Sequence, residues 1–235
     1  MDKYGMDRIR NIVIMGHGKA GKTSLTEAML FNSGAIDRMG TVADGTTVAD
    51  YDAEEIKRQV SINASVAPVE WKNMKYNILD TPGYFDFAGE VKEGLRAADS
   101  ALIVLSGRSG VSVGTEQVFK YAGQKGVPIV FFVNKIDDDR ANYQKTLEEM
   151  KEKFGKAVTP FVYPIKEGDE FKGFVDIIDM TARRYEGQDR VDIPVPDGME
   201  ETVAPLRDMI MEAVAETDDA LMNKYFNGEE FTFDE

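Results

Sequence analysis

Residues 9–24 read IRNIVIMGHGKAGKTS, and this stretch decides the fold. Its first seven residues are mostly β-branched and apolar, which is typical of a buried strand. Two glycines separated by four residues and followed by Lys22 and Thr23 then match the phosphate-loop pattern. Apolar residues recur at helical spacing after Thr23. Strand, glycine-rich loop and helix in this order predict a site for nucleotide phosphates, and a chance glycine turn is the alternative.

The loop offers a phosphate three kinds of contact. Its glycines let successive backbone N–H groups curl around the oxygens, and the helix N-terminus adds positive potential. We expect Lys22 to reach the terminal phosphates and Thr23 to ligate Mg²⁺. The residues predicted to contact the nucleotide in this stretch are Gly16, His17, Gly18, Lys19, Ala20, Gly21, Lys22, Thr23 and Ser24.

Apolar strands and amphipathic helices alternate as far as residue 157. This alternation predicts a mostly parallel sheet covered on both faces, the three-layer α/β architecture. The predicted elements are strands at 62–71 and 76–79, which form an antiparallel hairpin, strands at 101–105 and 129–133, and helices at 23–31, 115–124 and 143–154. Residues 37–59 show little periodicity, so we expect a long mobile loop without packed elements there.

After residue 157 the pattern changes to short strand-like pieces broken by Gly and Pro, at 158–165, 171–178 and 183–186. A helix follows, with a buried stripe of Val203, Leu206, Ile210 and Val214. This part predicts a small α+β insertion subdomain. We therefore divide the chain into a nucleotide-binding core, residues 1–157, and an insertion subdomain, residues 158–235.

A second motif, Asp80-Thr81-Pro82-Gly83, comes directly after an apolar strand. Its carboxylate and its glycine amide therefore emerge at the carboxyl end of that strand, where α/β sheets bind ligands. We expect Asp80 to hold Mg²⁺ through water and the Gly83 N–H to reach the γ-phosphate. Without the phosphate loop upstream, these four residues would indicate only a turn.

The third motif, Asn134-Lys135-Ile136-Asp137, also follows a buried strand. The Asp137 carboxylate can accept from the N1–H and 2-amino groups of guanine, whereas adenine does not present these two donors. Asn134 would orient the loop, and the stem of Lys135 would cover the base. Three motifs in this order predict a phosphate-loop GTPase that binds GTP or GDP with Mg²⁺.

The composition is that of an ordinary globular chain with a formal net charge of −14, which would repel nucleic acid and anionic membranes. Residues 199–235 hold 11 acidic and 2 basic residues, either as a solvated surface or as a docking face for a basic protein. The chain has no cysteine and a single histidine, so any metal must be held by oxygen. Neither a signal peptide nor a membrane-spanning run is evident, so we expect a cytoplasmic protein.

Several stretches resemble the translational GTPases, and the elongation factor G group in particular. They are Gly16-His17 at the start of the phosphate loop, residues 80–87 (DTPGYFDF), Val127-Pro128, and the insertion from Val158 to Met180 with its PI and GFVD pieces. The resemblance implies Mg²⁺-dependent GTP hydrolysis by a monomer that engages the ribosome. It also implies that the acidic 199–235 region could contact ribosomal proteins.

In that family an Arg-Gly-Ile-Thr stretch in the first switch provides a threonine ligand to Mg²⁺. The matching residues here are Arg58-Gln59-Val60-Ser61. Ser61 keeps the hydroxyl, which implies a metal site formed by Thr23, Ser61 and Asp80, while Gln59 replaces a glycine and would stiffen the loop. The alternative is that Ser61 simply starts the following strand.

Two other positions depart from the family. Tyr84 stands where a histidine orients the attacking water, and a phenol is neutral near pH 7. With Lys22, Gly83 and Tyr84 as the implied catalytic residues, we predict hydrolysis that is slow or dependent on a partner. Lys19 replaces an aspartate that helps to bind a monovalent cation. Its ammonium either substitutes for that cation or points to solvent.

The family has a further guanine loop, with Ser-Ala in most members, on a last strand after the insertion, and nothing after Asp137 fits it. We therefore expect an N-terminal fragment that lacks this strand, its helix and all downstream domains, and that binds guanine nucleotides weakly. Besides a hydrolysing translation factor, two functions stay open. One is a GTP-gated ribosome-binding module with little or no hydrolysis, and the other is a ribosomal protection or release-factor-like GTPase.

Overall fold

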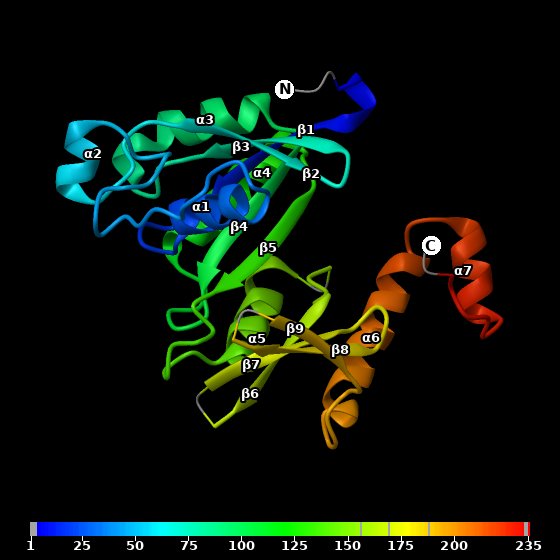
Figure 1. Ribbon diagram of the computed structural model, residues 1–235. Helices are drawn as coiled ribbons and strands as arrows, with labels where there is room; N and C mark the ends of the chain where they lie inside the picture. The colour runs from blue at the N-terminus through cyan, green and yellow to red at the C-terminus, as the bar shows by residue number, and fades with distance from the viewer. Residues whose placement is uncertain (1–3, 156, 169, 188, 233–234) are drawn as a thin grey trace. The chain divides into compact units, whose positions relative to one another are not determined.

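The strand that precedes the phosphate loop lies at the centre of a five-stranded sheet (Figure 1). This computed structural model describes residues 4–155, 157–168, 170–187, 189–232 and 235, so positions 233 and 234 of the acidic region lie outside it. The described chain packs as two units, Met1–Lys135 and Ile136–Glu235, and each is considered by itself.

In the first unit the strand order is β2-β3-β1-β4-β5. The β1 strand is parallel to β3 and β4, β4 is parallel to β5, and β2 forms an antiparallel hairpin with β3. The strands are β1 (Ile9–Met15), β2 (Ser65–Trp71), β3 (Met74–Asp80), β4 (Ser100–Ser106) and β5 (Ile129–Asn134). The helices are α1 (Lys22–Asn32), α2 (Ala53–Arg58), α3 (Ala88–Ala97) and α4 (Val113–Lys125), with short 3₁₀ turns at Met6–Arg8 and Phe85–Phe87.

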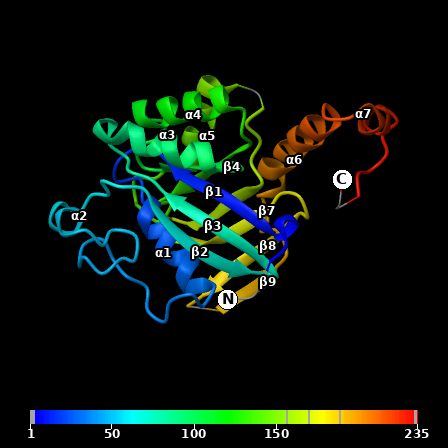
Figure 2. The ribbon, with the colours of Figure 1, turned by 90° about the horizontal axis from the view of Figure 1, so that it is seen from above.

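Both faces of this sheet are buried, because alternate residues of β1 enter different cores. Val13 and Met15 join a cluster with residues of α3 and α4, and Ile14 joins another with Leu30 of α1. Figure 2 shows α3 and α4 on one side of the sheet and α1 on the other. The predicted three-layer α/β fold with a mostly parallel sheet is confirmed.

Residues 37–59 differ from the prediction of a loop without packed elements, because they contain α2. Asp52 and Glu55 form a capping box at its start: the Asp52 side chain accepts from the Glu54 N–H, and Glu55 accepts from the Asp52 N–H at 3.2 Å. Gln59, where a glycine was expected from the family, ends the helix at φ 54°. A six-residue helix is too short for hydrophobic periodicity to reveal it. The α3 helix after Gly83 was also not predicted.

The second unit contains a four-stranded antiparallel meander in the order β6-β7-β8-β9. Its elements are α5 (Tyr143–Phe154), β6 (Val162–Glu167), β7 (Glu170–Asp176), β8 (Thr181–Glu186), β9 (Asp189–Ile193), α6 (Glu200–Ala215) and α7 (Asp219–Phe226). Three residues of the predicted α6 stripe are buried and the fourth, Val214, is partly buried: Val203 packs with Val175 of β7, and Leu206 and Ile210 pack with Leu147 of α5. No helix within the described residues is long and apolar enough to cross a membrane.

Candidate nucleotide-binding site

The phosphate loop connects β1 to α1 through positions that accept only glycine. Gly16 has φ 147°, and a Cβ there would lie 2.2 Å from the carbonyl oxygen of Val104 on β4. Gly21 caps α1 at φ 99°, and a Cβ there would lie 2.3 Å from Asn134 Nδ2. The backbone therefore passes tightly over the strand ends, which directs the N-terminus of α1 toward the predicted phosphate site.

Lys22 is buried at the start of α1, and its ammonium reaches back over the loop. Its Nζ donates to the backbone oxygens of Gly16 at 3.1 Å and His17 at 3.2 Å. Burial lowers the pKa of Lys22, while the nearby carboxylates of Asp80 and Asp50 raise it. A lysine in this place provides a point charge inside the ring of backbone amides, where phosphate oxygens would lie.

Asp80 ends β3 and is almost fully buried, at 2% exposure. Neither of its carboxylate oxygens has a hydrogen-bond partner among the described residues. Burial raises the pKa of Asp80 to about 7, and the Lys22 ammonium opposes this shift. A buried carboxylate without a donor is costly unless a ligand satisfies it. Hydrated Mg²⁺ fits such a position, because it prefers oxygen ligands and keeps several of its waters.

Ser61 lies beside the phosphate loop, although it is 38 residues from Thr23 in sequence. Its Oγ is 3.1 Å from Thr23 Oγ1. Ser61 precedes the first residue of β2, Ser65, so it does not start that strand. The structure thus brings together the two hydroxyls that the sequence proposed as metal ligands. Hereafter, residues 37–64 are called the first switch loop.

Asp50 of the first switch loop is a residue that the sequence analysis missed. It is buried. Burial raises its pKa, while the nearby Ser61 hydroxyl and the Lys22 ammonium oppose this shift. Asp50 is one of four aspartates between residues 37 and 52, and no sequence pattern separates it from the others. The site therefore has a second carboxylate close to Lys22.

Gly83 passes directly against the phosphate loop. A Cβ added there would lie 2.4 Å from Lys22 Nζ and 2.6 Å from the Gly18 backbone nitrogen. Any side chain at position 83 would displace one of these groups. The Gly83 backbone is therefore packed against both the Lys22 ammonium and the Gly18 amide of the phosphate loop.

The predicted guanine loop begins at the end of β5 and is tied to the phosphate loop. Asn134 Nδ2 donates to the Ala20 oxygen at 3.0 Å, and Lys135 Nζ donates to the Lys19 oxygen at 2.9 Å. Lys135 takes a left-handed backbone conformation, with φ 57°. Asp137 is exposed and belongs to the second unit.

The family described as Elongation factor Tu GTP binding domain matches residues 7–227. The chain belongs to this family. It is also similar to a solved structure of a protein from Thermus thermophilus, with a TM-score of 0.91 and 38% identity. That match covers 96% of this chain and 34% of the other, so the chain spans about a third of that relative's length. The chain thus carries a translational GTPase domain of the elongation factor Tu and G type.

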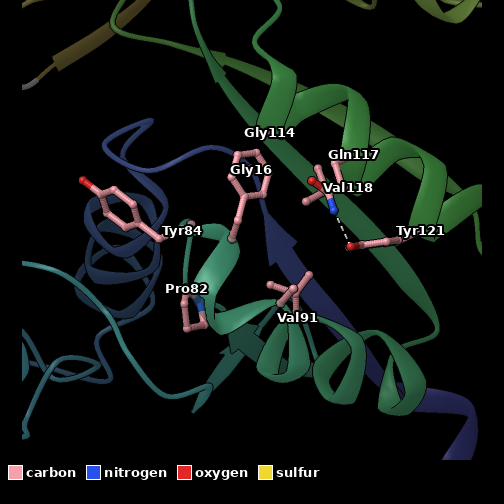
Figure 3. Close-up of a pocket in the computed structure, with 11 residues that line it drawn as sticks. Gly16, Pro82, Tyr84, Val91, Gly114, Gln117, Val118 and Tyr121 are labelled. Carbon is pink, nitrogen blue, oxygen red and sulfur yellow. Dashed lines mark hydrogen bonds between the residues drawn. The ribbon is translucent and has the colours of Figure 1, made fainter.

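In this GTPase domain Tyr84 lies over the phosphate loop, since its ring would be 3.0 Å from a Cβ on Gly18. Its side chain is 36% exposed. Tyr84 lines one end of a pocket between the segment after Gly83 and α4, and Figure 3 shows its ring directed away from Val91, Gln117 and Tyr121, which also line it. The residues lining that pocket include no charged side chain, so the pocket does not resemble a phosphate site.

The remaining residues of the GTPase domain that were predicted to contact the nucleotide differ in their exposure. Lys19 is exposed at φ 65°. His17 is also exposed, and its imidazole lies against the start of α4, where a Cβ on Gly114 would be 2.5 Å from Nδ1. Ser24 is exposed in the first turn of α1, whereas Ala20 is buried.

Proposed function

We propose that this chain is the GTP-binding domain of an elongation factor G-like translation factor, whose Mg²⁺-dependent GTP hydrolysis is coupled to ribosome engagement. The observation that carries the proposal is the pairing of Ser61 with Thr23 beside the unpartnered Asp80. It supports an Mg²⁺ site formed by Thr23, Ser61 and Asp80, with the phosphates held by residues 16–24. Bound there, Mg²⁺ would neutralise charge on the β- and γ-phosphates.

The chain's own groups contribute mainly position and charge to the reaction. Lys22 would hold the terminal phosphates, and the Gly83 N–H would donate to a γ-phosphate oxygen. Tyr84 would orient the attacking water through its hydroxyl, without the positive charge that an imidazole can carry. We therefore propose slow or ribosome-dependent hydrolysis. The alternative of a GTP-gated ribosome-binding module with little hydrolysis is favoured by the same residue.

Asp137 would bind the guanine base, and Asn134 and Lys135 would hold the loop that carries Asp137. We propose that the nucleotide-binding core extends to residue 157 and that the insertion subdomain follows it. The acidic 199–235 region is proposed to meet ribosomal proteins. The protein is proposed to act as a cytoplasmic monomer. A ribosomal protection or release-factor-like role would use the same domain.

Two measurements on the 235-residue chain test this proposal. The first is the affinity for GDP and ADP with and without Mg²⁺, where we expect a preference for GDP of at least about 100-fold. Equal affinities would contradict the guanine site. The second is single-turnover GTP hydrolysis with ribosomes by wild type, Tyr84→His and Tyr84→Phe. We expect the histidine variant to be at least about tenfold faster than wild type. Equal wild-type and Tyr84→His rates would exclude the limiting role given to the phenol.

A further inference from the structure

Glu27 is a charged residue with no role in the site as described so far. It lies on α1, one helical turn after Thr23, and its exposure is 0%. Its two carboxylate oxygens accept backbone N–H groups of the first switch loop, from Gly40 at 3.1 Å and from Val48 at 2.5 Å. A buried carboxylate is costly unless donors satisfy it, so this pair of hydrogen bonds accounts for its burial.

Between these two anchor points the loop closes on itself. The Thr46 N–H donates to the Thr41 oxygen at 3.2 Å, and Thr41 Oγ1 donates to Asp44 at 2.8 Å. A Cβ on Gly40 would lie 2.3 Å from the Thr46 oxygen and 2.9 Å from Glu27 Oε2. Residues 40–48 thus form a closed turn held against α1.

This turn leads directly into the part of the loop proposed to bind the metal. Asp50 follows Val48 by two residues, a span of at most about 7 Å. It is buried beside the Ser61 hydroxyl, which lies 3.1 Å from Thr23 Oγ1. The first switch loop therefore leads from Glu27, past Asp50 and Ser61, to Thr23, and both Glu27 and Thr23 are on α1.

We propose that Glu27 is a positioning residue, which fixes the first switch loop on α1 so that Asp50 and Ser61 face Thr23. The inference rests on the proposed function, because it gives Ser61 and Thr23 their role at Mg²⁺. Glutamate suits this position because an ionised carboxylate can only accept hydrogen bonds, and both groups that it contacts are N–H donors. Glutamine would turn an amide donor toward one of them, and aspartate would be one methylene too short.

The test uses the full chain with Glu27→Gln and, as a matched control, Glu54→Gln. Glu54 is a half-buried residue of α2 whose side chain pairs with the exposed Arg58, at 3.4 Å. Two quantities are measured first: tryptic cleavage within the loop at Arg38, Lys57 and Arg58 without nucleotide, and the Mg²⁺ concentration that half-saturates binding of a non-hydrolysable GTP analogue. GDP affinity at saturating Mg²⁺ is the third.

For Glu27→Gln we expect cleavage in the loop to rise at least about tenfold, which corresponds to about 1.4 kcal/mol. The Mg²⁺ requirement for the GTP analogue should rise by a similar factor. GDP affinity at saturating Mg²⁺ should stay within about threefold of wild type, because the phosphate loop is intact. Glu54→Gln should match wild type in all three measurements.

A second variant, Gly40→Ala, keeps the carboxylate but forces the turn away from it. It should reproduce the Glu27→Gln pattern, and it tests the proposal even if Glu27→Gln fails to fold. Unchanged loop cleavage in both variants, or an equal loss of GDP and GTP-analogue affinity, would overturn the role of Glu27. A wild-type chain whose GTP-analogue binding is insensitive to Mg²⁺ would instead overturn the proposed function, and the role of Glu27 with it.

Discussion

The phosphate loop and the first switch loop reach the same site by different means. The phosphate loop takes its shape from glycines at points where a side chain would collide, such as Gly16 against Val104 and Gly21 against Asn134. The first switch loop takes its shape from buried carboxylates that accept its backbone N–H groups, chiefly Glu27 and Glu55. The shape of the phosphate loop is thus determined by its own glycines. The shape of the first switch loop is determined by carboxylates that are distant in sequence from the N–H groups they bind, Glu27 on α1 and Glu55 on α2.

The largest effect is expected where the phosphate loop touches the sheet. Gly16→Ala places a Cβ 2.2 Å from the Val104 oxygen at a positive φ. We expect the free energy of unfolding to fall by about 3 kcal/mol or more and nucleotide binding to be lost. Urea denaturation and GDP titration would measure both quantities.

Gly123→Ala is the matched control for that change. Gly123 lies within α4 and is exposed, and a Cβ added there would have no neighbouring atom within 4 Å. Alanine there should raise stability by about 0.5–1 kcal/mol, because glycine is the poorer helix former. If Gly16→Ala were as well tolerated as this control, steric exclusion would not be what shapes the phosphate loop.

The sequence predicted the phosphate loop and the strand ends better than it predicted the first switch loop. The phosphate loop, Asp80 and Asn134 were predicted because each lies at the end of an apolar strand, and the sheet order of a three-layer fold brings such ends together. The contacts of Glu27 span 13 and 21 residues and end on backbone groups, which every residue has. No pattern of side chains can mark such an acceptor. Asp50 was missed because no pattern separates it from the neighbouring aspartates, and α2 was missed because six residues are too few to show helical periodicity.

A smaller and more local effect is expected for Glu55→Gln. Glu55 is buried and accepts from the Ile62 N–H at 2.8 Å and the Asn63 N–H at 3.0 Å. Charge-assisted hydrogen bonds are worth about 1.5–3 kcal/mol, so amide hydrogen exchange at residues 62 and 63 should accelerate about tenfold or more. The amides of residues 16–22 should keep their wild-type rates. Equal acceleration in both loops would show that they are one cooperative unit, which removes the contrast between them.

Ser61→Ala tests the point where the two loops meet. It removes the hydroxyl that lies 3.1 Å from Thr23 Oγ1. We expect the affinity for a GTP analogue in Mg²⁺ to fall about tenfold, equivalent to about 1.4 kcal/mol, while GDP affinity is unchanged. Ser61→Thr keeps the hydroxyl and should bind like wild type. If the difference between Ser61→Ala and wild type persisted after EDTA had removed Mg²⁺, the hydroxyl would be acting on the loop rather than on the metal.

The smallest effect is expected at Gln59, where two opposing terms can be separated. The residue ends α2 at φ 54°, a left-handed conformation that costs a side-chain-bearing residue about 1 kcal/mol relative to glycine. Its Nε2 also donates to the Ala43 oxygen at 3.0 Å, which contributes about 0.5–1.5 kcal/mol. Gln59→Ala keeps the backbone cost and loses the hydrogen bond, so it should destabilise the chain by about 1 kcal/mol.

Gln59→Gly removes both terms, so its stability should lie within about 0.5 kcal/mol of wild type. Denaturation midpoints of the three proteins at constant m-value measure the difference. A glycine variant much more stable than wild type would mean that the Ala43 hydrogen bond contributes nothing in solution. A glycine variant as unstable as Gln59→Ala would mean that the backbone cost is negligible. Between these limits, the glutamine side chain offsets the strain of its own backbone, which explains how this loop can hold a left-handed residue that is not glycine.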